Sequence, residues 1–160
     1  MSRNYLAPIF NAIYNIRFDK ENFKNRLLMQ KAIYLLEDLG VTIGDYPFSW
    51  YKRGPYSQAL QNDILAIDSA SADMSDITFA PYAQSCIDAL KNIVSQRPDE
   101  YELSTWLECV ASMRYLITYT FIVSVDFDTV NAELKIRKPH LNNDTANHTA
   151  FELICQMFSE

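Results

Sequence analysis

One short stretch of the chain places aromatic and basic side chains next to one another. It contains Trp50, Tyr51, Lys52, Arg53 and Tyr56. Tyr, Trp and Arg are enriched among the residues that contribute most to protein–protein affinity. We therefore predict that Tyr51, Lys52, Arg53 and Tyr56 form an exposed lip, and that all five residues bind a partner protein. In the alternative interpretation, Lys and Arg contact phosphates while the aromatic rings stack on bases.

The helix expected after this stretch bears on the nucleic-acid alternative. It begins at Ser57 and would occupy the recognition position of a winged helix. Gln and Asn side chains can hydrogen-bond adenine edges. The polar residues expected to be exposed there are Gln58, Gln61, Asn62, Asp63 and Asp68. Because none of them is Lys or Arg, a protein partner is favoured over DNA.

A second group of residues is predicted to support the lip. Gln30 and Lys31 lie on an apolar helix upstream of a Gly-Pro turn. Buried turn carbonyls need hydrogen-bond partners. We expect Gln30 and Lys31 to hydrogen-bond this turn and fix it against the helix.

Arg114 is the only charged residue between Cys109 and Asp126. Its predicted helix is otherwise apolar, so we expect a partly buried guanidinium, which needs a paired carboxylate. We expect that carboxylate to come from the acidic residues 61–134. A carboxylate of a ligand or partner is the alternative.

The remaining reactive residue types form no recognisable catalytic or metal pattern. His140 and His148 lie outside the usual metal-ligand spacing, and no Cys or carboxylate cluster accompanies them. We predict no metal, no cofactor and no catalytic residue, which leaves an enzyme of unknown reaction as the least favoured class. The thiols expected to be buried and reduced are Cys86, Cys109 and Cys155.

Composition bounds the class of protein. The chain has 160 residues, of which 49% are hydrophobic and 21% charged, as in an ordinary globular domain. The net charge is -6, yet residues 1–60 carry eight Lys/Arg against five Asp/Glu, whereas residues 61–134 carry three against twelve. This balance disfavours general nucleic-acid binding. The sequence predicts no signal peptide and no transmembrane segment, so we expect a cytoplasmic protein.

Hydrophobic spacing predicts a mainly α fold in one compact domain, residues 1–160, with a small β-hairpin of winged-helix type. The expected N-caps of the second, third and fifth helices are Asp19, Ser57 and Ser104, and that of the seventh is Asn143 or Asp144. The sixth helix is expected to start at Asp128 or Thr129. A loop is expected at 69–76. Strands are expected at 46–51 and 77–80, and helices at 3–16, 23–39, 57–67, 82–96, 105–122, 128–137 and 143–158.

The motif residues also resemble a known family. Met29-Gln30-Lys31-Ala32-Ile33-Tyr34, an aromatic strand and Gly54-Pro55-Tyr56-Ser57 resemble the Panacea (SocA-like) domain and the related YwgA-like proteins. Those families have a Leu-Gln-Lys-x-x-Tyr core, with Leu at the place of Met29. The resemblance continues at Glu108–Ser112, at Tyr115-Leu116 and at Lys138-Pro139-His140. The family-motif positions that we expect to have a structural role are Gln30, Lys31, Tyr34, Gly54, Pro55 and Ser57.

This resemblance implies a non-enzymatic module. Panacea-like domains are encoded in toxin–antitoxin, phage and other mobile-element settings, and many act as antitoxins by binding a toxin protein directly. The resemblance implies the same for this chain, with no catalytic residue to carry over. We therefore expect stoichiometric masking of a partner protein. A winged-helix-like DNA-binding regulator is the alternative.

Overall fold

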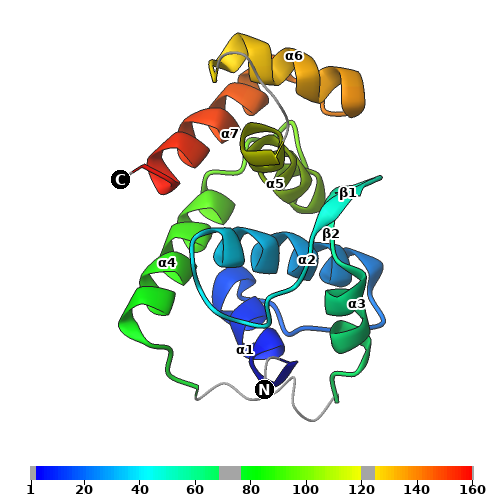
Figure 1. Ribbon diagram of the computed structural model, residues 1–160, viewed down its shortest axis with the longest axis vertical. Coiled ribbons are helices and arrows are strands. Elements are labelled where there is room, and N and C mark those ends of the chain that lie inside the picture. The colour runs from blue at the N-terminus through cyan, green and yellow to red at the C-terminus, as the bar shows by residue number, and fades with distance from the viewer. Residues whose placement is uncertain (1–2, 69–76, 120–124, 160) are drawn as a thin grey trace.

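The computed structural model describes residues 3–68, 77–119 and 125–159. These residues form helices and one two-stranded antiparallel hairpin, which confirms the predicted mainly α fold class (Figure 1). The elements are α1 (Arg3–Tyr14), α2 (Phe23–Asp38), β1 (Ser49–Tyr51), β2 (Gly54–Tyr56), α3 (Gln58–Leu65), α4 (Pro81–Ser95), α5 (Leu103–Tyr119), α6 (Phe127–Arg137) and α7 (Asp144–Met157).

Helix α2 is the centre of the core. It packs against α1, α3, α4 and α5, and every residue from Leu27 to Leu36 is buried. A helix that is apolar on most sides has to be covered on most sides. The N-cap is Asn22, whose side chain accepts a hydrogen bond from the backbone N–H of Asn25, so the predicted Asp19 cap is wrong. Asp19 instead accepts from the N–H of Glu21 in the preceding turn.

The hairpin differs from the predicted strands. Its register pairs Ser49 with Tyr56 and Trp50 with Pro55. The strand predicted at 46–51 therefore begins only at Ser49, and residues 77–80 are not a strand. The backbone N–H of Tyr46 donates to the Glu37 carboxylate instead of to a neighbouring strand. The partner strand is the Gly-Pro-Tyr segment that was predicted as a turn.

Other element boundaries shift by a few residues. Ser57 and Asn143 cap α3 and α7 as predicted. Helix α6 begins at Phe127, slightly before the predicted start at Asp128 or Thr129. Its N-cap is Asp126, whose side chain accepts from the N–H of Thr129. Helix α5 begins at Leu103, so Ser104 lies inside it. The expected loop at 69–76 and the end of the helix predicted to reach 122 lie outside the described residues.

Helix α5 joins the two ends of the molecule. It packs on α2, on β2 and on both C-terminal helices, α6 and α7, which lie beyond it in Figure 1. Trp106 is fully buried, and its indole N–H donates to the carbonyl of Ile93. Within the described ranges, no helix is both long and apolar enough to cross a membrane.

Candidate functional site

The β-hairpin is held to the helical core by side chains that bind its backbone. The Gln30 side chain donates to the carbonyl of Ser57 and accepts from the N–H of Ser57, both at 2.9 Å. Lys31 Nζ donates to the carbonyl of Pro55 at 2.7 Å. Lys31 thus makes the expected hydrogen bond to the Gly54-Pro55 segment, whereas Gln30 binds Ser57, the residue that follows β2. Lys138 adds a third anchor, since its Nζ donates to the carbonyls of Tyr51, at 2.6 Å, and of Lys52.

The two lysine anchors lie in a cluster of buried ionisable groups. Burial lowers the pKa of Lys31 to about 7, against the opposing attraction of the Glu108 carboxylate. Burial also lowers the pKa of Lys138. Glu108 is itself buried and lies 2.9 Å from His140 Nε2. Lys31 and Lys138 both donate to backbone carbonyls of the hairpin, so these two buried amines hold it in place.

Gly54 brings the hairpin against α5. Its φ is +89°, a left-handed value that favours glycine. A Cβ at this position would overlap Ser112 Oγ, which is buried and has no hydrogen-bond partner among the described residues. The hairpin therefore contacts α5 more closely than any residue with a side chain would allow.

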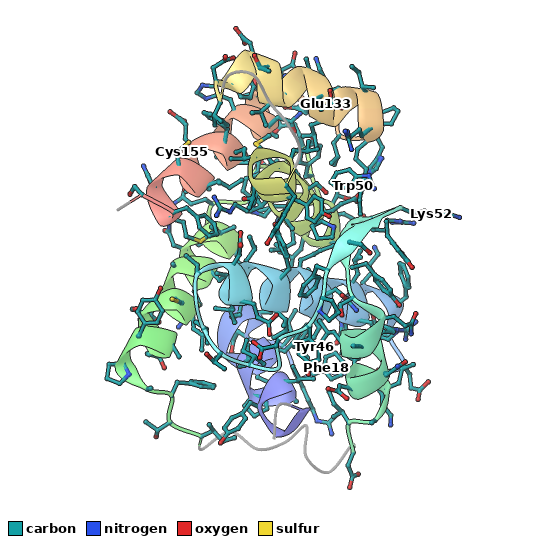
Figure 2. The ribbon with its side chains drawn as sticks, in the orientation of Figure 1. Phe18, Tyr46, Trp50, Lys52, Glu133 and Cys155 are labelled. Carbon is teal, nitrogen blue, oxygen red and sulfur yellow. The ribbon has the colours of Figure 1, made fainter. Side chains whose placement is uncertain are left out.

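A groove of about 510 Å³ lies between the hairpin and the first half of α2. Four of the five predicted partner-binding residues line it, and they are the four predicted for the lip: Tyr51, Lys52, Arg53 and Tyr56. Trp50 does not. The structure turns its ring to the other side of the hairpin, against Tyr115 and above Lys138 Nζ at 4.9 Å. Figure 2 shows Trp50 against the helices while Lys52 extends away from the molecule.

The groove combines aromatic surface with positive charge. The rings of Tyr51 and Tyr56 stack with centroids 4.8 Å apart and an interplanar angle of 15°. The Phe23 ring lies 5.6 Å from the Arg53 guanidinium and 5.8 Å from that of Arg26. Phe23 and Tyr51 are each 53% exposed. A cation and the face of an aromatic ring attract each other, so the Phe23 ring and the two guanidinium groups hold one another in place.

Two groove residues were missed by the sequence analysis. Phe23 and Arg26 occupy the first turns of α2, far from the hairpin in sequence. An aromatic residue directly after the Asn22 cap, at the polar end of an apolar helix, is the signal that could have indicated an exposed ring. Nothing in the spacing indicated which segment it would face.

Arg114 has a different role from the groove cations. Its Nε lies 2.6 Å from Asp38 Oδ2, and its guanidinium lies 3.6 Å from the centre of the Phe158 ring. The predicted structural ion pair is present, but the expected source of the carboxylate is wrong. Asp38 belongs to α2, not to the acidic residues 61–134, because α5 packs directly on the end of α2.

The histidines and cysteines are dispersed. His140 contacts Glu108, and His148 Nδ1 lies 3.4 Å from Glu152. In the part of the chain that the structure describes, no cluster of His, Cys, Asp or Glu could hold a metal ion.

Cys86 and Cys109 are buried free thiols as expected, whereas Cys155 is exposed on α7. The prediction of a buried Cys155 is wrong because its position falls on the solvent side of the last helix.

Comparisons with family models, curated proteins and solved structures find no match to this chain. The functional conclusion therefore depends on the chemistry of the groove.

Proposed function

We propose that this protein is a non-enzymatic binding module that takes an acidic segment of a partner protein into the groove between its hairpin and α2. The observation that carries the proposal is the lining. Arg26, Lys52 and Arg53 border the groove, and none of the described lining residues is acidic. A cationic groove with aromatic walls complements a segment that carries carboxylates beside apolar side chains.

Some groove residues hold the hairpin and others are left to contact a partner, and this arrangement supports binding rather than catalysis. Gln30 and Lys31 border the groove too, but their polar atoms already bind Ser57 and Pro55. They leave Arg53 and Lys52 as the cations at the tip. Arginine suits this task because its planar guanidinium makes paired hydrogen bonds to a carboxylate while its face rests on an aromatic ring.

The resemblance to the Panacea domain extends the proposal. It would make the partner a toxin or effector protein, and masking would proceed by one-to-one binding without turnover. A toxin gene beside the gene for this protein, and a stable complex on co-expression, are expected on that view.

The test compares two charge reversals. Tagged wild type, Arg53→Glu and Lys91→Glu are purified from the native host at native expression, with nuclease present. Lys91 is an exposed lysine on α4 and controls for the change in net charge. We expect one stoichiometric protein partner that is lost with Arg53→Glu and kept with Lys91→Glu.

The other outcomes are distinct. A partner kept by Arg53→Glu would refute the groove as the binding surface. Nucleic acid recovered without nuclease and released by moderate salt, with no protein partner, would favour the DNA-binding alternative. Recovery of neither would count against both.

A further inference from the structure

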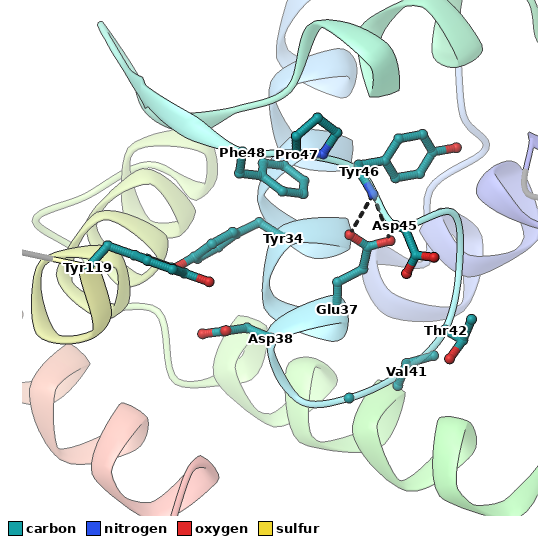
Figure 3. A pocket seen from close by; sticks show the side chains of 11 residues that line it. Tyr34, Glu37, Asp38, Val41, Thr42, Asp45, Tyr46, Pro47, Phe48 and Tyr119 are labelled. Atoms are coloured by element: carbon teal, nitrogen blue, oxygen red, sulfur yellow. Dashed lines mark hydrogen bonds between the residues drawn. The ribbon is translucent and has the colours of Figure 1, made fainter.

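A second cavity lies at the opposite end of α2 from the groove. Its volume is about 510 Å³, within the range of small-ligand pockets. It is bordered by the last turns of α2, by the segment leading to the hairpin and by the end of α5 (Figure 3). Its principal lining residues are Tyr34, Glu37, Asp38, Asp45, Phe48 and Tyr119.

The Tyr34 hydroxyl gives this cavity its most specific feature. Tyr34 is only 2% exposed, and within the described residues its hydroxyl has no hydrogen-bond partner. Leaving such a group unpaired costs about 1–3 kcal/mol. Figure 3 shows Tyr34, Tyr119 and Asp38 converging on one side of the cavity. A ligand at that point would give the hydroxyl the partner that the protein does not supply.

The charge of the lining is negative. Glu37, Asp38 and Asp45 contribute carboxylates, and the described lining contains no Lys, Arg or His. Asp38 is balanced by Arg114, and Glu37 accepts hydrogen bonds from backbone N–H groups. Asp45 is exposed. The C-terminal end of α2 adds the negative end of its helix dipole. The cavity therefore favours a cation.

The walls define which cation fits. The rings of Tyr34 and Phe48 contact edge to face, with centroids 5.2 Å apart, and Tyr34 also lies 6.1 Å from Tyr115. Aromatic faces attract organic cations and cover an alkyl chain. The tyrosine and carboxylate oxygens accept hydrogen bonds. A cation that bears N–H groups can donate these bonds, whereas a quaternary ammonium has no N–H to donate.

We propose that this cavity binds a small alkylammonium ion, with the ammonium group beside Tyr34 and Asp38 and the alkyl chain against Phe48. The Tyr34 hydroxyl accepts one ammonium N–H. Glu37 holds the Tyr46 backbone that forms the wall. The site is separate from the groove, so this inference does not depend on the proposed function.

The test is a titration of the purified protein with n-butylammonium chloride, followed by NMR and calorimetry. Sodium butyrate and tetramethylammonium chloride are the matched probes. We expect saturable binding of butylammonium, with shifts at Tyr34 and Phe48, and binding of tetramethylammonium at least fivefold weaker. Butyrate should not bind.

Three variants locate the site. Tyr34→Phe removes only the unpaired hydroxyl and should weaken butylammonium binding at least fivefold without lowering the melting temperature. Asp45→Asn, which removes a negative charge from the exposed rim of the cavity, should also weaken binding, but by a smaller factor. Asp99→Asn, an exposed carboxylate elsewhere, is the control and should have no effect. Absence of saturable binding, binding unchanged by both Tyr34→Phe and Asp45→Asn, or equal affinity for tetramethylammonium would each overturn the proposal.

Discussion

The contact between Gly54 and Ser112 provides the sharpest test of how the hairpin is held. Gly54→Ala places a methyl group where φ is +89° and where Ser112 Oγ already lies. The left-handed backbone costs an alanine about 1–2 kcal/mol. Overpacking of a buried contact adds about 1–3 kcal/mol. We therefore expect Gly54→Ala to lower the free energy of unfolding by about 2–5 kcal/mol.

A double-mutant cycle separates the two causes. Ser112→Ala alone should be neutral or stabilising, because it removes a buried hydroxyl without a partner among the described residues. It also relieves the overlap, since Ser112 Cβ would remain 3.6 Å from the new methyl group. In the Ser112→Ala background, Gly54→Ala should then cost only the backbone term of about 1–2 kcal/mol.

Urea unfolding, monitored by tryptophan fluorescence, measures the free energy of unfolding of each of the four proteins in the cycle. If the slope of this free energy against urea concentration is the same in all four, the denatured state is unaffected. A coupling energy of about 1–3 kcal/mol between the two positions is expected. Additive effects would refute the overlap as the cause, and a cost of Gly54→Ala below about 0.5 kcal/mol would refute the close docking of the hairpin.

Four further predictions concern buried and exposed groups. Burial lowers the pKa of Lys31 to about 7, so between that pH and about 10 the unfolded chain holds the extra proton. The free energy of unfolding should therefore rise with pH across this window, and Lys31→Met should flatten the rise in chemical unfolding at several pH values. Arg114→Ala leaves the Asp38 carboxylate mostly buried and unpaired, and should cost about 3 kcal/mol in urea unfolding. Lys135→Ala, which breaks an exposed pair, should cost less than about 1 kcal/mol in the same assay. Cys155 should be the one thiol that a thiol reagent modifies in the native protein, because Cys86 and Cys109 are buried. Only the thiolate reacts and partial desolvation raises the pKa of Cys155, so the reaction should be slow at neutral pH and faster as the pH rises. Protection of Cys155 under native conditions would contradict its placement on α7.

Local rules predicted most of the helices and failed where distant segments compete. The apolar spacing around Leu27 to Leu36 was sufficient to place the central helix, because a helix buried on most sides shows it in sequence. The strand at 46–51 was predicted too long because alternating aromatics favour extended backbone. The Glu37 carboxylate takes up the N–H of Tyr46 instead, and a single sequence does not show that contact.

The candidate site was predictable to the extent that it lies on one segment. The lip residues on the hairpin were found because they are neighbours in sequence. Trp50 was grouped with them, although alternation along a strand puts it on the opposite side from Tyr51. Phe23 and Arg26 were missed because only the docking of the hairpin on α2 brings them to the groove. The second cavity was not foreseen, since Tyr34 had been assigned a structural role.

The anchors and the groove are linked by geometry. Lys31 and Lys138 bind the hairpin through its backbone carbonyls, so they fix the position of the hairpin without using its outward side chains. Holding Tyr51 and Arg53 in place before a partner arrives reduces the entropy lost on binding.

An anchor variant such as Lys138→Met should therefore weaken partner binding through hairpin mobility, with a faster dissociation rate and little change in the salt dependence of association. Arg53→Glu should instead slow association and reduce its dependence on salt. Stopped-flow binding at several salt concentrations distinguishes the two, and identical kinetic effects of both variants would show that the anchors and the lip are not separate functions.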